Sequence, residues 1–400
     1  MKNNRDVVIV SMGRTAIGDF GGSLKSVRAH QLAARVIKHL VDNTGIDPAC
    51  IDDVVLGDCC QSPDEANTAR TAALAAGIPV EVPACTLQRQ CSSAMQALAQ
   101  TATYIKAGEG EVFIAGGVES MSSAPYILPD ARWGARLMHK QMVDAVWEML
   151  HSGSCLLEPP GYIMGQTAEN LAREHSITRE EQDIVAVRSH NNAEAAVADG
   201  KFKDEIVPVE IPRRKKDPIV FDTDEHIRPN LSVEDLAGLR PVFDKKGSVT
   251  AGNSSGLNDG AAICIVTSRE KASELGLAPV AKIHSHAVAG CPPEIMGWGP
   301  VPSTKKLLKK TGVALSDIEL IELNEAFAAQ YLACEKGLDL NRDITNVNGS
   351  GIGLGHPVGC TGARIVISLI GEMKRRGCTL GLATLCVGGG MGMSMLIENE

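Results

Sequence analysis

Two pairs of stretches repeat each other along the chain, and this repetition constrains the fold more than any other feature. Residues 44–57 (TGIDPACIDDVVLG) align without gaps onto residues 311–324 (TGVALSDIELIELN), and both end a strand-like run. Further on, residues 112–122 (VFIAGGVESMS) resemble residues 384–394 (TLCVGGGMGMS), each a strand pattern running into paired glycines. Either likeness alone fits two generic β-α units, but two in the same order favour an internal duplication. We therefore expect two similar α/β halves, with a site at their junction that draws residues from both.

Strand-like and helix-like runs alternate in the manner of a layered α/β protein. The alternation breaks after Gly117 and resumes near residues 260–268. Between them lie irregular stretches that contain Pro and Met, one polar helix and the basic run RRKK. We predict an N-terminal half over residues 1–271, made of a core at 1–117 and 250–271 with an inserted loop domain at 118–249, and a C-terminal half over residues 272–400.

Charge and composition exclude several classes of function. The net charge of −9 gives no basic surface, so we expect no nucleic-acid binding. No run of about 18 apolar residues is present, so we expect no membrane-spanning helix. The chain has 12 cysteines but neither a signal-peptide pattern nor a C-x-x-C pair, which predicts free thiols, a cytoplasmic location and no metal site. The run RRKK at 213–216 is expected to be a solvated face, with an anionic ligand as the alternative.

Cys91 stands at a boundary in the sequence QRQCSSAMQAL. An apolar stretch ends before it and a helix-like run begins after it, so Ser92 or Ser93 is expected to cap that helix. A thiol at a helix start lies at the positive end of the helix dipole, which favours the thiolate below the free pKa of roughly 8.5. The alternative is a small cysteine of the core.

Three stretches near the C-terminus carry further candidates. Asn324 and Glu325 follow a strand-like run, where polar side chains face a cleft more often than they are buried, although a structural cap is the alternative. His356 lies in the glycine-rich stretch 346–365, which matches neither G-x-G-x-x-G nor a P-loop. Cys386 ends an apolar run before three glycines. Taken singly, His356 and Cys386 fit a satisfied histidine and a buried cysteine.

Together these residues supply what nucleophilic catalysis at a carbonyl needs. The requirements are an activated nucleophile, a base for its proton, donors for the oxyanion and a second acid or base. Several stretches, in order, also closely resemble the thiolases, the acetyl-CoA C-acyltransferases. The resemblance covers essentially all of the chain, and it rests on QRQCSSAMQAL, GGVESMS, MGQTAEN, GSVTAGNSSGLNDGAA, MGWGPVPS, NEAFAAQ, NVNGSGIGLGHPVGCTGARI and CVGGGMG.

The resemblance implies a five-layer αβαβα fold built from two similar halves, with a long loop insertion in the first half. It implies that Cys91 is the nucleophile and holds the acyl group as a thioester. His356 would accept the Cys91 proton and, with Asn324 acting through a water, polarise the thioester carbonyl. Cys386 would move a proton on and off the α-carbon of acetyl-CoA. Its backbone N–H would form a second oxyanion hole with Gly388.

The resemblance also implies a substrate site and an assembly. The substrates would be acyl-CoA thioesters, with coenzyme A as a substrate and no separate cofactor. Residues 122–142 resemble the loop that tethers two tight dimers in tetrameric members, so we expect a homotetramer. The residues expected to contact CoA or to line the acyl pocket are Ser255, Phe243, Arg228, Met164, Met296 and Phe327.

Two departures bear on the substrate. Ile163 stands where many short-chain members have a histidine, and the pattern around Cys91 differs from the commoner Cys-Gly-Ser. We expect reversible thiolysis of a short-chain 3-ketoacyl-CoA, acetoacetyl-CoA above all, or condensation of two acetyl-CoA. The alternatives are a broad-range degradative 3-ketoacyl-CoA thiolase, a decarboxylating ketoacyl synthase and a non-catalytic lipid- or CoA-binding protein. Bulky Met296 and Phe327 favour small acyl groups, while Ile163 favours some tolerance of five or six carbons.

Overall fold

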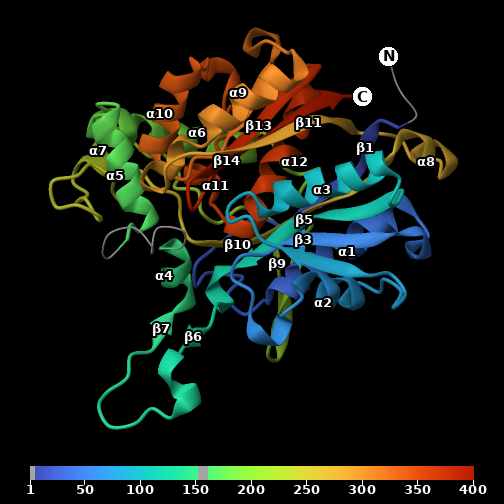
Figure 1. The fold of residues 1–400 in the computed structure, drawn as a ribbon, viewed down its shortest axis with the longest axis horizontal. Helices are drawn as coiled ribbons and strands as arrows, with labels where there is room; N and C mark the ends of the chain where they lie inside the picture. Colours follow the sequence, from blue (N-terminus) through green and yellow to red (C-terminus); the bar gives the residue numbers. More distant parts are fainter. Residues whose placement is uncertain (1–4, 152–160) are drawn as a thin grey trace.

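A mixed β-sheet forms the centre of the molecule in the computed structural model, which describes residues 5–151 and 161–400. The strand order is β12-β13-β14-β11-β1-β10-β5-β3-β4, and β2 pairs with β10 (Figure 1). The strands of the first half are β1 Val7–Arg14, β2 Gly18–Asp19, β3 Asp53–Gly57, β4 Ala84–Leu87, β5 Val112–Ser120 and β10 Asn258–Ser268. Those of the second half are β11 Ala281–Gly290, β12 Leu320–Leu323, β13 Leu380–Val387 and β14 Met391–Asn399.

The two halves meet along one short seam of the sheet. Strands β1 and β11 pair antiparallel, with Val8 opposite Lys282 and Ile9 opposite Ala281. On either side of the seam the strands follow the same pattern: β10, β5 and β3 beyond β1, and β14, β13 and β12 beyond β11. The predicted architecture of two similar α/β halves is therefore confirmed.

Helices cover the sheet in three layers, which with the two half-sheets make the five predicted layers (Figure 1). Helices α1 (Ala29–Thr44) and α2 (Thr68–Ala75) share one core with the outer face of the N-terminal strands. Helices α9 (Pro300–Thr311) and α10 (Ala328–Leu338) do the same for the C-terminal strands. Helices α3 (Ser93–Ala107) and α12 (Val358–Arg376) share a central core with strands of both halves.

The central helices approach each other closely because one contact surface is glycine. A Cβ added at Gly362 of α12 would lie 2.6 Å from the Met95 backbone nitrogen of α3, closer than real Cβ atoms come. Burial on all sides also explains the composition of these helices, which carry small and aliphatic residues where an exposed helix would carry charge.

The first sequence repeat matches equivalent elements, since both copies run from a helix end into β3 or β12. The second repeat finds the equivalent strands β5 and β13 but in the wrong register. Val54 pairs with Ile114 and its counterpart Ile321 pairs with Leu382. Ile114 is therefore equivalent to Leu382, whereas the sequence alignment matched it to Cys386. The sequence alignment matched the paired glycines of the two strands, but these glycines occupy different positions relative to β5 and β13.

The inserted segment is more regular than the irregular stretches of its sequence suggest. Strand β5 continues through Ser120, past the expected end at Gly117, because its last residue still pairs with Asp259 of β10. The segment contains helices and two short hairpins, and residues 152–160 lie outside the described residues. Its elements are β6 Tyr126–Ile127, β7 Val143–Asp144, α4 Ala145–Leu150, α5 Met164–Glu174, α6 Arg179–Ala198, β8 Val209–Arg213, β9 Lys216–Phe221 and α7 Val233–Ala237.

Helices α5 and α6 pack against the C-terminal half, although they belong to the first half in sequence. Leu171 and Val185 are buried in the same core as Leu332 of α10. Two shorter helices complete the fold, α8 (Arg269–Glu274) and α11 (Gly351–Leu354). Among residues 5–151 and 161–400, the helices are too short or too polar to cross a membrane.

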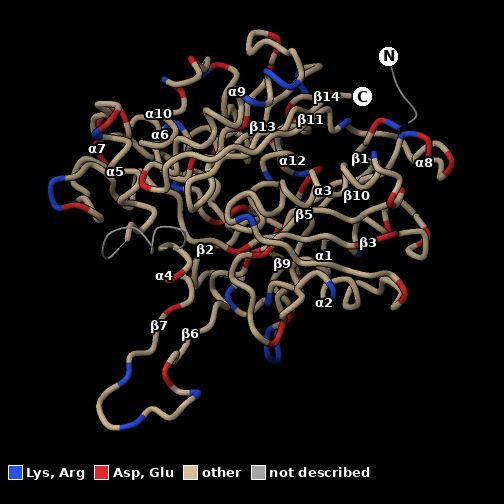
Figure 2. The backbone as a smooth tube through the Cα atoms, viewed as in Figure 1, with Lys and Arg blue, Asp and Glu red and all other residues tan. Residues whose placement is uncertain are grey.

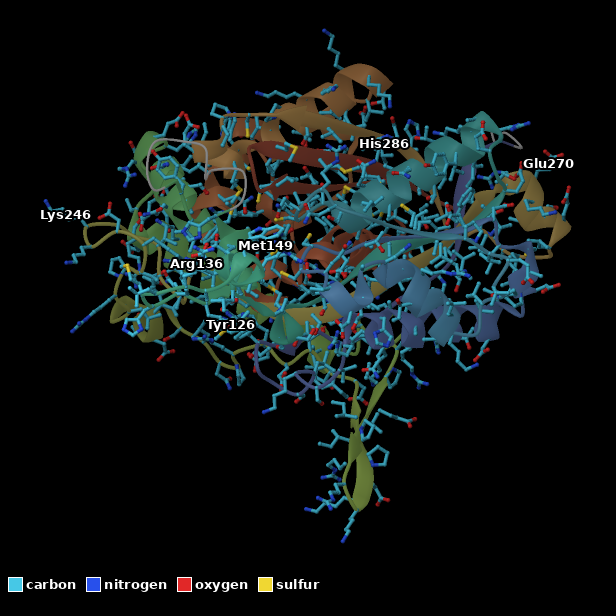
Figure 3. The ribbon with its side chains drawn as sticks, turned by 60° about the horizontal axis from the view of Figure 1, so that its bottom comes forward. Tyr126, Arg136, Met149, Lys246, Glu270 and His286 are labelled. Carbon is cyan, nitrogen blue, oxygen red and sulfur yellow. The ribbon has the colours of Figure 1, made fainter. Side chains whose placement is uncertain are left out.

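Two projections leave the body of the molecule. The hairpin β8–β9 carries the run RRKK at its tip, where the charges are exposed as predicted (Figures 2 and 3). The longer projection is the loop around β6 and β7, which extends far from the body (Figure 1). Its side chains include Trp133, Leu137 and Met138, which are 85%, 94% and 84% exposed.

Candidate active site

Cys91 lies in the tight connection between β4 and α3. Gln90 before it takes a positive φ of 45°, and Ser92 occupies the N-cap position of α3. The predicted side-chain cap is wrong, because the Ser92 hydroxyl donates to the Arg89 carbonyl at 3.0 Å and the Ser93 hydroxyl to the Gln90 carbonyl at 2.7 Å. The two serine hydroxyls therefore stabilise the turn that carries Cys91, and the Ser92 side chain does not cap the N–H groups at the start of α3.

The Cys91 thiol is neutral at physiological pH. Burial raises its pKa to about 11, although N–H groups of Gly388 and of Cys91 itself favour the thiolate. The sequence predicted a pKa lowered by the helix dipole. That prediction is wrong, because the cost of desolvating a thiolate exceeds the stabilisation by nearby amide dipoles.

His356 supplies a base whose orientation is fixed. The Thr361 hydroxyl donates to the Pro357 carbonyl at 2.8 Å and lies 2.7 Å from His356 Nδ1. A hydroxyl that already donates must accept from the ring, so Nδ1 carries the proton and Nε2 keeps its lone pair. Burial, and secondarily the charge of Arg364, lower the pKa of His356 to about 3, so the imidazole is neutral.

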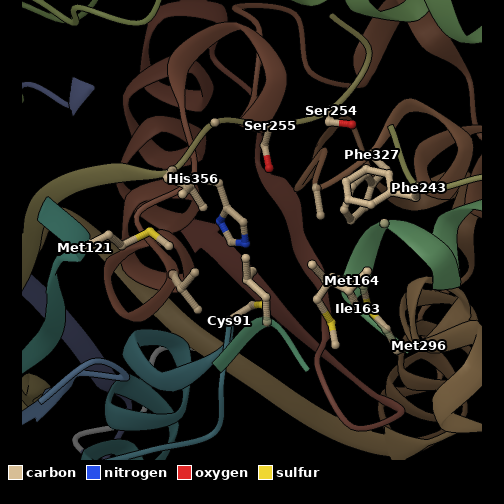
Figure 4. Close-up of a pocket in the computed structure, with 16 residues that line it drawn as sticks. Cys91, Met121, Ile163, Met164, Phe243, Ser254, Ser255, Met296, Phe327 and His356 are labelled. Carbon is tan, nitrogen blue, oxygen red and sulfur yellow. The ribbon is translucent and has the colours of Figure 1, made fainter. Parts of the chain in front are cut away.

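An apolar cavity of about 130 Å³ joins these two side chains. Figure 4 shows the His356 ring pointing toward the part of the cavity where Cys91 lies. Its walls combine residues of the inserted segment, of the loop before β10 and of the C-terminal half. The lining residues are Cys91, Met121, Leu150, Ile163, Met164, Gly165, Phe243, Ser254, Ser255, Gly256, Leu257, Met296, Ala326, Phe327, His356 and Val358.

Most of the predicted binding residues therefore lie together: Ser255, Phe243, Met164, Met296 and Phe327 all line the cavity. Arg228 does not. Its side chain is exposed, and its backbone N–H donates to His190 Nδ1 at 3.2 Å.

Three further predicted residues do not line the cavity: Cys386 and Gly388 lie near Cys91, and Asn324 is two residues before the lining residue Ala326. Cys386 is fully buried against Met296 and Ala326. The N–H of Gly388 donates to the Cys91 sulfur. The Asn324 amide is also fully buried, and neither its oxygen nor its nitrogen has a partner among the described residues. A buried amide with no protein partner is suited to hold a water molecule.

Glu325 is structural, in line with the alternative considered for it, and it does not face a cleft. It is fully buried, accepts from Asn346 at 2.8 Å and pairs with the Ser189 hydroxyl. The Ser189 hydroxyl in turn accepts from the N–H of Gly353 at 2.9 Å. Glu325 therefore anchors the glycine-rich stretch that leads to His356.

Sequence reasoning missed a second carboxylate next to the site. Glu119, fully buried, accepts from the N–H of Cys60 at 2.9 Å and of Gly359 at 2.7 Å. Burial and the nearby Asp58 carboxyl raise the pKa of Glu119 well above its ordinary value, so the pair holds a proton. Its position in GGVES gave no local sign of this role, since the pairing with Asp58 depends on the sheet.

Sequence comparisons agree with this geometry. Residues 7–270 match the family model "Thiolase, N-terminal domain", and residues 277–399 match "Thiolase, C-terminal domain". The chain belongs to the thiolase family, and it is an acyltransferase.

Particular relatives match over almost their whole length. The acetyl-CoA acetyltransferase of Cupriavidus necator is 47% identical, with 99% of this chain and 100% of the relative covered. The crystal structure of the Bacillus anthracis acetyl-CoA acetyltransferase is similar with a TM-score of 0.96 and 54% identity, covering 99% of each chain. The crystal structure of human mitochondrial 3-ketoacyl-CoA thiolase gives a TM-score of 0.95 at 41% identity, covering 99% of this chain and 100% of that one.

Proposed function

We propose that the protein catalyses the reversible thiolysis of acetoacetyl-CoA and, in reverse, the condensation of two acetyl-CoA, through an acyl group carried on Cys91. The observation that carries this proposal is the neutral thiol of Cys91 in an apolar cavity with the free Nε2 of His356. A thioester can enter such a cavity. Cys91 can then attack it while His356 takes the thiol proton, so no thiolate has to form beforehand.

In the first half-reaction the Cys91 sulfur attacks the 3-keto carbonyl carbon of the 3-ketoacyl-CoA while His356 Nε2 takes the thiol proton. Because the thiol pKa is about 11, proton transfer has to accompany the attack. The bond between the carbonyl carbon and the α-carbon breaks, and acetyl-CoA leaves as its enolate. Cys386 protonates that enolate at the α-carbon and becomes a thiolate. The thiol of a CoA molecule then attacks the acyl carbon on Cys91 as its proton passes to Cys386. The acyl–sulfur bond to Cys91 breaks, and the leaving sulfur takes back the proton from His356.

Fixed donors stabilise the negative oxygen in each step. Gly388 N–H already points at the Cys91 sulfur and would meet the oxygen of the acyl-enzyme tetrahedral intermediate. A water on the free Asn324 amide, together with His356, would meet the thioester oxygen of the enolate. Each such donor contributes on the order of 10²–10³ in rate in other enzymes.

The cavity walls support a short acyl group. Met296 is buried, and with Phe327 it closes the wall beside Cys386. Ile163 also lines the cavity, on the side where Met164 and Met296 lie (Figure 4), and it offers no polar contact there. We therefore expect acetoacetyl-CoA to be the preferred substrate, with some activity on 3-ketoacyl-CoA chains of five or six carbons. The second candidate, a broad-range degradative activity, draws support from the similarity to human 3-ketoacyl-CoA thiolase.

We propose further that the enzyme is a cytoplasmic homotetramer. The cysteines of residues 5–151 and 161–400 are all free thiols, which suits a reducing compartment. The exposed Trp133, Leu137 and Met138 on the long projection need a partner surface, and a second dimer would provide one.

Substitution of the nucleophile tests the proposal. Cys91→Ser should abolish trapping of a radiolabelled acetyl group from acetyl-CoA, and it should abolish thiolysis of acetoacetyl-CoA. Cys50→Ser, outside the cavity, is the matched control. Near wild-type thiolysis by Cys91→Ser would refute the nucleophile. A wild-type enzyme that cleaves eight-carbon but not four-carbon substrates would refute the substrate.

A further inference from the structure

Asn258, the first residue of β10, connects the catalytic histidine to the N-terminal half. Its side chain is fully buried, and Oδ1 accepts from the His356 backbone N–H at 2.8 Å. The amide nitrogen donates in the other direction, to the Gly18 carbonyl and to Asp19 Oδ1, each at 3.1 Å. One amide thus satisfies three groups from two separate segments.

The backbone before His356 lies directly on this amide. Gly355 takes a φ of +102°, and a Cβ added there would lie 2.7 Å from Asn258 Cγ. Gly355 is therefore required both by its backbone conformation and by the space that Asn258 occupies. A shift of the Asn258 side chain would move the backbone that carries the imidazole.

Beyond Asn258 the network returns to the cavity wall. Asp19 Oδ1 lies 2.5 Å from His226 Nδ1, and this contact lowers the pKa of Asp19, so the carboxylate is charged. His226 Cε1 would lie 2.5 Å from a Cβ added at Gly256. Gly256 lines the cavity next to Ser255. The chain from His226 through Asp19 and Asn258 therefore joins the wall beside Ser255 to the backbone of His356.

We propose that Asn258 is a positioning residue that sets the place of His356 relative to Cys91, and that Asp19 and His226 hold Asn258 in the orientation this requires. The inference rests on the proposed function, in which His356 takes the Cys91 proton. Asn258 touches neither reacting atom. Its effect is expected on the reactivity of Cys91 and on kcat more than on KM.

An exchange of donor and acceptor tests the network. Asn258→Asp keeps the acceptor for the His356 N–H but sets a second carboxylate against Asp19. Asn258→Asp together with Asp19→Asn restores one donor and one acceptor across the same contact. The single variant should alkylate Cys91 with iodoacetamide at least about tenfold more slowly at neutral pH, with a similar fall in kcat, since small misplacements of a catalytic group cost about this much or more. The double variant repairs the contact between positions 258 and 19 but leaves a carboxylate oxygen facing the Gly18 carbonyl, so it should recover part of both losses and alkylate well above the His356→Gln rate.

Cys91 alkylation is measured by mass spectrometry of its peptide as a function of pH, with His356→Gln as the floor. The measurement needs no acyl-CoA, so it remains valid even if the enzyme prefers another substrate. Asn253→Asp is the matched control, because Asn253 is a buried amide that accepts from Thr250 N–H and donates to Asp183 and to the Ser248 carbonyl. It should lower the unfolding temperature without slowing Cys91 alkylation.

Two results would overturn the proposal. One is an Asn258→Asp enzyme that alkylates at the wild-type rate. The other is a folded double variant that remains as slow as the His356→Gln floor. If the single variant does not fold, the double variant alone tests the proposal, because its contact between positions 258 and 19 again joins a donor to an acceptor.

Discussion

The hydroxyl of Thr361 is the contact whose loss should change catalysis most for the smallest change in shape. Thr361→Val keeps the volume of this fully buried side chain but removes the only described partner of His356 Nδ1, at 2.7 Å. The ring then either keeps an unpaired N–H in an apolar site, at a cost of about 1–3 kcal/mol, or moves the proton to Nε2 and ceases to be a base. We expect kcat/KM for acetoacetyl-CoA to fall about tenfold to hundredfold, because about 1.4 kcal/mol corresponds to a tenfold change in rate.

The assay is thiolysis of acetoacetyl-CoA by CoA at several pH values, with unfolding temperatures alongside. Thr361→Ser retains the hydroxyl and should stay within about threefold of wild type. Thr101→Val is the stability control, since the Thr101 hydroxyl is buried and donates only to helix carbonyls of α3, Ala97 at 3.0 Å and Leu98 at 3.1 Å. If Thr361→Val retained wild-type kcat/KM, the assigned tautomer of His356 would be wrong.

Three further results are expected. Burial lowers the pKa of His356 to about 3 and of His190 to about 4, so acid favours the unfolded chain, in which both histidines take up a proton. Each histidine should therefore lower the free energy of unfolding by up to about 2 kcal/mol between pH 6.5 and 5. If the unfolding free energy of His190→Gln fell as steeply with pH as that of the wild type, this expectation would be wrong. Trp133→Ser with Leu137→Ser should convert the proposed tetramer to dimers, as measured by light scattering. A wild-type enzyme that is already a dimer would show that the loop does not tether two dimers. The kcat/KM for a four-carbon 3-ketoacyl-CoA should exceed that for an eight-carbon one at least about tenfold. Phe327→Ala should narrow that ratio. Equal activity on a sixteen-carbon substrate would show that Met296 and Phe327 do not close the cavity.

Much of the site could be predicted because its residues stand at ends of elements. Cys91 and Cys386 follow apolar runs, and His356 lies among glycines, so each position is visible in the chain itself. The resemblance to the thiolases then gave the fold and half of the residues that line the cavity. Arg228 lies outside the cavity with an exposed side chain, and its expected contact with CoA stays a prediction.

What the sequence did not predict depends on contacts between distant segments. The raised pKa of Cys91 follows from burial by walls that come from both halves, which outweighs the local helix dipole. Likewise the pairing of Glu119 with Asp58, and of Asn258 with the backbone of His356, joins strands far apart in the chain. The packing of α5 and α6 on the C-terminal half is of the same kind.

The close packing of α3 against α12 has a mechanical consequence. Cys91 lies just before the N-cap of α3, and His356 lies just before the N-cap of α12. The contact between these two helices, at Gly362, therefore sets the spacing between nucleophile and base. This contact holds the two residues at a fixed distance, because α3 and α12 cannot move apart without disrupting the central core. Substrate therefore binds without a change in the spacing between Cys91 and His356, and heat should inactivate the enzyme at the temperature at which the halves separate, with no loosened but active state before it.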